Sequence, residues 1–149
     1  MKQIVIIGAG QAAGWAVHTL RHQGYDGEIH VISNEDRIFY ERPPLSKQVL
    51  SQEATVESLD LFSADQVEAF AVICHKPDVA VKIDTQAQQV HLQSGQVLAY
   101  DKLLIATGSR ARMPVAAWAN LNNVYTLRDI QDCQNLAKAF ETAKSIAVI

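Results

Sequence analysis

Short apolar runs alternate with longer amphipathic stretches along the chain, and this pattern is typical of an α/β protein. The apolar runs predict strands at residues 3–7, 28–32, 71–74, 79–83, 100–105, 124–125 and 144–149. Residues 89–92 and 97–99 flank Ser94-Gly95 and predict a hairpin. Helices are predicted from the first glycines to Gly24, over 45–50, from a capping box at Ser63 to residue 70, and over 130–140. The expected fold is therefore a parallel, Rossmann-like sheet with an added antiparallel hairpin or meander.

The first apolar run leads directly into the turn Gly8-Ala9-Gly10-Gln11-Ala12-Ala13-Gly14. Gly8 permits a tight turn, and Gly10 lets the backbone approach a pyrophosphate. Small Ala13 and Gly14 allow the following helix to pack closely. A turn that only joins a strand to a helix is the alternative, but the strand before and the helix after favour a nucleotide-binding turn.

The second predicted strand ends in Ser33-Asn34-Glu35-Asp36, where dinucleotide-binding folds place a ribose-binding carboxylate. Asn34 stands where an acid would be the stronger acceptor, and Glu35 follows it. Both are candidate ribose ligands. The same composition is also typical of a solvated turn.

Composition narrows the possible functions. The 149 residues are 48% hydrophobic, enough for about one domain with a core, and a net charge of −3 with scattered cations predicts no nucleic acid partner. Cys74 and Cys133 lie too far apart for a redox pair and are too few for zinc, so we expect no metal. No signal segment or membrane-length run is visible, which predicts a cytoplasmic protein without a membrane partner. Cys74-His75 is interpreted as structural, because this histidine has no evident partner in the sequence.

A second motif, Arg42-Pro43-Pro44-Leu45-Ser46-Lys47, is held stiff by its prolines. Physical reasoning alone favours a surface loop with two solvated cations. Further along, Ala106-Thr107-Gly108 follows a buried strand, and Arg110 or Arg112 could neutralise phosphate. With the glycine turn, these motifs resemble the FAD-dependent ferredoxin reductases of aromatic-ring dioxygenase systems, within the pyridine nucleotide-disulfide oxidoreductase superfamily.

The resemblance implies that NADH reduces FAD, which passes electrons to an iron–sulfur ferredoxin. It also implies that Lys47 lies beside the flavin and tunes it, as the catalytic candidate. The implied FAD contacts are Gly8, Gly10, Gln11, Ala12, Ala13, Gly14, Asn34 or Glu35, Arg42, Lys47, Ala80, Ala106, Thr107, Gly108, Arg112 and, as second choice, Arg110. Asn34 departs from the expected acid.

The resemblance further predicts that residues 1–143 form the N-terminal part of an FAD-binding domain and that 144–149 begin an NAD-binding domain. With one dinucleotide turn, these 149 residues are expected not to oxidise NADH by themselves. Three alternatives remain: a related NADH oxidase or disulfide reductase, a plain NAD-binding dehydrogenase, and a non-catalytic FAD-binding module. A redox cysteine near the flavin is missing for the first, and the second leaves residues 42–47 unexplained.

Overall fold

The structure is a computed structural model that describes residues 2–149. It contains two compact units. The first comprises the residues up to Tyr40 together with Asp60–Gly108, and the second comprises Glu41–Leu59 together with Ser109–Ile149.

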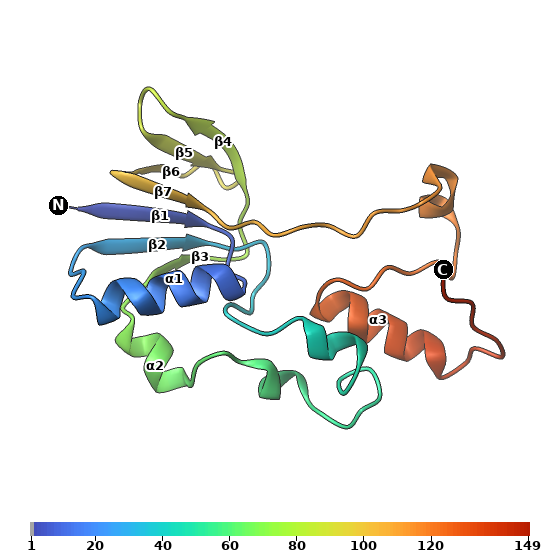
Figure 1. The fold of residues 1–149 in the computed structure, drawn as a ribbon. Coiled ribbons are helices and arrows are strands. Elements are labelled where there is room, and N and C mark those ends of the chain that lie inside the picture. Colours follow the sequence, from blue (N-terminus) through green and yellow to red (C-terminus); the bar gives the residue numbers. More distant parts are fainter. Residues whose placement is uncertain (1) are drawn as a thin grey trace. The chain divides into compact units, whose positions relative to one another are not determined.

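A four-stranded sheet forms the centre of the first unit (Figure 1). Its strands are β1 (Gln3–Ile7), β2 (Glu28–Ile32), β3 (Ile73–His75) and β7 (Lys102–Ile105), in the order β3-β2-β1-β7. All three pairings are parallel, and Ile4 lies between Ile29 and Lys102 in the register. The predicted parallel sheet is therefore confirmed.

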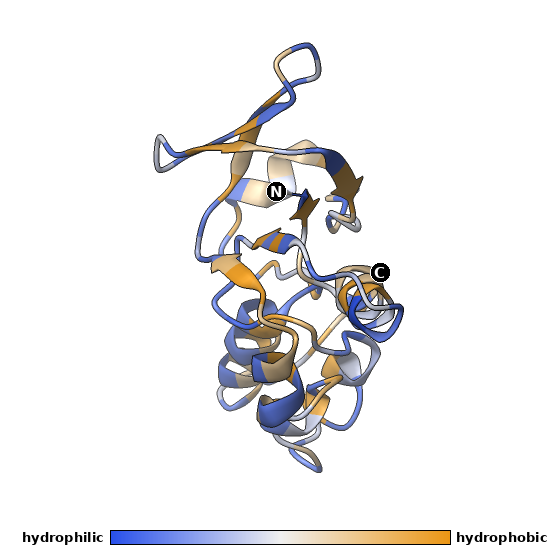
Figure 2. Cartoon of the chain, turned by 90° about the vertical axis from the view of Figure 1, so that its left-hand side faces the viewer, coloured by the Kyte–Doolittle hydropathy of each residue, from blue (hydrophilic) through white to orange (hydrophobic). Residues whose placement is uncertain are grey.

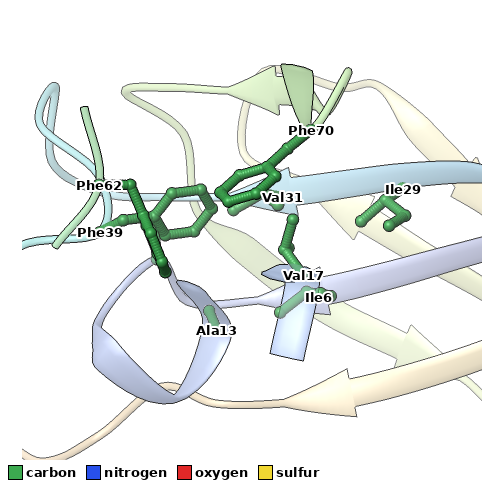
Figure 3. Packing of buried hydrophobic residues seen from close by; sticks show 9 residues of the cluster. Ile6, Ala13, Val17, Ile29, Val31, Phe39, Phe62 and Phe70 are labelled. Atoms are coloured by element: carbon green, nitrogen blue, oxygen red, sulfur yellow. The ribbon is translucent and has the colours of Figure 1, made fainter. Parts of the chain in front are cut away.

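Helices α1 (Gln11–His22) and α2 (Ala64–Ala69) belong to this unit. The Ser63 side chain accepts from Gln66 N and the Gln66 side chain accepts from Ser63 N, which confirms the capping box. Gly14 lies close to two aromatic rings, since a Cβ there would be 3.0 Å from the Phe62 ring and 3.1 Å from the Phe39 ring. Figure 3 shows the resulting core of aliphatic and aromatic side chains, which includes Ile6, Ala13, Val17, Ile29, Val31, Phe39, Phe62 and Phe70.

A second, antiparallel sheet consists of β4 (Ala80–Asp84), β5 (Gln89–Leu92) and β6 (Val97–Ala99). Its buried side chains pack against alternate residues of the parallel sheet, in a cluster formed by Val5, Ile7, Ile32, Val90, Leu92 and Leu98. The strands carry mostly hydrophobic colour, whereas the helices show both hydrophilic and hydrophobic stretches (Figure 2). The predicted hairpin and meander are confirmed.

The second unit contains the short 3-10 helices Pro43–Ser46, Val56–Leu59 and Ala116–Asn120, and helix α3 (Ile130–Phe140). Asp129 caps α3 by accepting from Asp132 N at 2.9 Å, and the helix spans 130–140 as predicted. Inside this unit the Cys133 thiol donates to the Leu45 carbonyl at 3.2 Å, and burial raises the pKa of this thiol.

Several local predictions are wrong. The helix expected over 45–50 is a single 3-10 turn at Pro43–Ser46, and residues 124–125 and 144–149 form no strand. A strand requires a hydrogen-bonded neighbour, and Val148 is 94% exposed. Helix α3 buries Cys133 but leaves Phe140 exposed. No helix within residues 2–149 is long and apolar enough to span a membrane.

Candidate functional site

The glycine turn lies at the carboxyl ends of three strands. Gly8 N donates to the Ile32 carbonyl at 2.9 Å, and Ala106 N donates to the Ile7 carbonyl at 2.8 Å. Gly8 has φ +108°, and a Cβ there would lie 2.2 Å from the Ala106 carbonyl oxygen. The close approach of the backbone after β7 and the positive φ thus require glycine at position 8. The structure brings the predicted motifs Gly8–Gly14 and Ala106–Gly108 together.

The N-terminus of α1 opens beside this turn. Gly10 is its N-cap residue, no side chain caps the helix, and no acidic residue lies in its first turn. The N–H groups of Gln11, Ala12 and Ala13 therefore have no partner within the helix. A Cβ at Gly10 would meet no atom within 4 Å. Open space next to unpaired N–H groups at a positive helix end suits a pyrophosphate.

The sheet order places this opening at a topological switch point. From β1 the chain passes through α1 to β2 on one side, while β7 pairs with β1 on its other side. Open α/β sheets bind ligands outside the carboxyl ends of their strands at such a point. Thr107 and Gly108 follow β7 there as exposed residues, and Gly108 has φ +68°.

The two ribose candidates differ in their surroundings. Asn34 is exposed, whereas Glu35 is half-buried and its carboxylate accepts from the Tyr40 hydroxyl at 2.5 Å. The Ser33 side chain bonds both the N–H and the carbonyl of Glu35. Tyr40, which the sequence analysis missed, thus orients the Glu35 carboxylate. Which of the two residues binds a ribose stays a prediction.

Ala80 begins β4, where it pairs with Leu92 and packs half-buried against the second core cluster. It shares the first unit with the glycine turn. Its contact with an adenine stays a prediction.

The four predicted cationic contacts belong to the second unit. Arg42 is half-buried and its Nη1 donates to the Arg128 carbonyl at 3.0 Å, while Arg128 Nε donates to the Ser109 carbonyl at 3.0 Å. Lys47 is exposed and its N–H donates to the Pro44 carbonyl at 3.0 Å. Arg110 and Arg112 are exposed in an irregular segment. Their roles toward phosphate or flavin stay predictions.

His75 has a partner that the sequence analysis missed. Its Nε2 lies 2.9 Å from Nδ1 of His30, so the expectation of a lone histidine is wrong. The two residues are 45 positions apart in the sequence, and only the pairing of β2 with β3 brings them together. Within residues 2–149 no group of three His, Cys, Asp or Glu side chains is placed to hold a metal ion.

The sequence matches one protein family over almost its whole length. Residues 2–149 match the family described as pyridine nucleotide-disulphide oxidoreductase. The chain belongs to this family. A ferredoxin–NAD(+) reductase component of the p-cumate 2,3-dioxygenase system of Pseudomonas putida is 36% identical over 149 residues, which are 100% of this chain and 37% of the relative. The corresponding component of the biphenyl dioxygenase system of Paraburkholderia xenovorans (strain LB400) is 38% identical over 98% of this chain and 36% of the relative.

Solved structures agree with this assignment. A covalent putidaredoxin reductase–putidaredoxin complex matches with a TM-score of 0.85 and 35% identity, over 93% of this chain and 34% of that one. A ferredoxin reductase for the CYP199A2 system of Rhodopseudomonas palustris matches with a TM-score of 0.86 and 31% identity, over 95% and 35% of the two chains. The chain thus spans about a third of the length of the relatives it matches.

Proposed function

We propose that these residues are the FAD-binding part of an NADH-dependent ferredoxin reductase. The observation that carries the proposal is the uncapped N-terminus of α1, with open space at Gly10 and the end of β7 packed against Gly8. The N–H groups of Gln11, Ala12 and Ala13 would bind the pyrophosphate of FAD. Asn34 or Glu35 would bind the adenosine ribose, and Ala80 would contact the adenine through its backbone.

When bound, FAD supplies the redox chemistry, since a flavin accepts a hydride and releases single electrons. The protein contributes charge and orientation. Ala106, Thr107 and Gly108 would lie along the cofactor at the switch point, where backbone without bulky side chains permits close approach. The resemblance assigns phosphate or flavin contacts to Arg42, Lys47 and Arg112, with Arg110 as second choice, and makes Lys47 the residue that tunes the flavin.

The relatives named as ferredoxin–NAD(+) reductase components support NADH as electron donor and a small iron–sulfur ferredoxin as acceptor. We assign NAD to a second nucleotide-binding domain that begins at residues 144–149, and residues 1–143 to the FAD-binding domain. A cytoplasmic location, without nucleic acid or membrane partners, belongs to the same proposal. A non-catalytic FAD-binding module would use the same turn.

Binding of the two dinucleotides tests the cofactor assignment. The purified chain is titrated separately with FAD and with NAD in a calorimeter, and the visible spectrum is recorded after gel filtration. We expect FAD to bind and to leave flavin absorbance in the protein fraction. Binding of NAD without any detectable affinity for FAD would contradict the proposal.

A further inference from the structure

Two histidines that the proposed function does not use meet on the parallel sheet. His30 lies on β2 and His75 ends β3, where it pairs in register with Ile32. Their rings are nearly parallel, at 17°, and Nδ1 of His30 is 2.9 Å from Nε2 of His75. His30 is only 7% exposed. One ring therefore donates this hydrogen bond and the other accepts it.

Polar groups extend this contact on both sides. Oε2 of Glu28 lies 3.5 Å from Nε2 of His30, and Oε1 of Gln96 lies 3.2 Å from Nδ1 of His75. Glu28 is on β2, whereas Gln96 lies in the turn between β5 and β6. The four side chains thus connect the parallel sheet to the antiparallel sheet of the same unit.

The acceptor at Gln96 sets the direction of the hydrogen bonds. Since Oε1 of Gln96 only accepts, Nδ1 of His75 carries a hydrogen, and Nε2 of neutral His75 is left as an acceptor. Nδ1 of His30 then donates to it. If His30 is also neutral, its Nε2 has no hydrogen and faces the Glu28 carboxylate. This buried nitrogen indeed has no hydrogen-bond partner among residues 2–149.

We propose that the His30–His75 pair is a binding site for a single proton, taken up at Nε2 of His30. Without this proton, Nε2 of His30 and the Glu28 carboxylate are two acceptors that face each other. With it, Nε2 donates a charge-assisted hydrogen bond to Glu28. An unbroken series of hydrogen bonds then connects Glu28, His30, His75 and Gln96. A second proton has no place, because two positively charged donor rings would face each other across 2.9 Å.

The surroundings of His75 keep this second ring neutral. Burial lowers the pKa of His75, and the neighbouring His30 lowers it further. The hydrogen bond with Gln96 and the carboxylate of Asp78 act in the opposite direction and are weaker. On the other side, the β1 residue in register with His30 is the uncharged Val5. Glu28, two positions before His30 on β2, is the acid whose carboxylate lies within ion-pair distance of His30.

The pair is tied to the carboxyl end of β2 through the backbone. Ser33 N donates to the His75 carbonyl at 3.0 Å, and Asp78 N donates to the Ser33 carbonyl at 2.7 Å. A neutral His75 stabilises the fold fully above its ordinary pKa of 6.5, and this contribution is lost as the pH falls through its lower folded value. The stabilisation of β2, β3 and the β5–β6 turn that depends on a neutral His75 therefore decreases as the pH falls below 6.5.

Histidine side-chain NMR of the full chain tests the proposal, with the ring nitrogens followed from about pH 8.5 to about pH 4.5. We expect one ring of the pair, His30, to gain a proton while His75 stays neutral until the fold is lost. Glu28→Gln removes the carboxylate 3.5 Å from Nε2 of His30 and should make this proton uptake less favourable, so that it occurs at lower pH. Glu68→Gln, an exposed charge change on α2, is the matched control and should leave the titration midpoint of His30 unchanged.

Two results would overturn the proposal. One is a wild-type titration in which both rings protonate with the same midpoint, and this holds whether or not the variants fold. The other is a midpoint that Glu28→Gln moves no further than Glu68→Gln does. Neither measurement requires FAD, so failure here leaves the proposed cofactor assignment intact.

Discussion

Two glycines of one turn have different physical roles. At Gly8 the φ of +108° is positive, and any Cβ would lie 2.2 Å from the Ala106 carbonyl oxygen, so the fold excludes a side chain there. At Gly10 a Cβ would have no atom within 4 Å, so the fold itself does not require glycine. The space at Gly10 is therefore available to a ligand.

Gly10→Ala should weaken FAD binding at least about tenfold, because the methyl group occupies the approach of the pyrophosphate. The free energy of unfolding without FAD should change by less than about 1 kcal/mol. Gly8→Ala should instead destabilise the fold by about 2 kcal/mol or more, since it adds backbone strain and a clash. Calorimetric FAD titration and urea unfolding of both variants separate the two effects. Wild-type FAD affinity in Gly10→Ala would show that no pyrophosphate approaches this turn.

Lys47→Ala should lower the reduction potential of bound FAD by about 30 mV or more, because a nearby ammonium group stabilises the anionic reduced flavin. The amount of FAD bound should stay close to wild type, since one charge matters more to the flavin than to anchoring. Lys138→Ala removes an exposed lysine from α3 and is the control. Equal reduction potentials of bound FAD in the two variants would show that Lys47 does not lie near the flavin and is an ordinary solvated lysine.

At the scale of elements, one arginine holds the end of α1 to two other segments. Arg21 Nε donates to the Phe70 carbonyl at 2.7 Å, and its Nη1 donates to the carbonyls of Tyr25 at 2.7 Å and Gly27 at 2.9 Å. Nη2 adds a contact with the Ala71 carbonyl at 3.3 Å. The planar guanidinium thus satisfies carbonyls from the α1–β2 connection and from the end of α2 at once.

Arg21→Lys should lower the free energy of unfolding by about 2–4 kcal/mol, because an ammonium group cannot reach these carbonyls together and leaves some unpaired. Arg37→Lys is the matched control: its paired bonds to Asp60 lie near the surface, at 2.8 and 2.7 Å, and should contribute less than about 1 kcal/mol. Urea unfolding measures both. Similar losses in the two variants would contradict a special role for Arg21.

At the scale of the whole molecule, residues 2–149 contain one glycine turn that opens a helix after a parallel strand, and we assign it to FAD. Hydride transfer requires a nicotinamide held within about 3–3.5 Å of the flavin, and such placement contributes about 7–11 kcal/mol to catalysis. The 149-residue chain with added FAD and NADH should therefore reduce ferricyanide no faster than free FAD does. A rate like that of a longer relative would place the nicotinamide site within these residues.

Much of the candidate site follows from the sequence alone. The run at Gln3–Ile7, the turn at Gly8–Gly14 and the strand at Glu28–Ile32 were predicted because periodicity and turn chemistry act between close neighbours. The capping box at Ser63 was predicted for the same reason, since a capping side chain bonds to a group three residues away.

The tertiary structure alone decided which distant groups meet. It placed Ala106 against Gly8, paired His30 with His75, and joined Arg21 to Phe70 across 49 positions of sequence. Such outcomes depend on strand order and register, and the sequence within a local window does not contain that information.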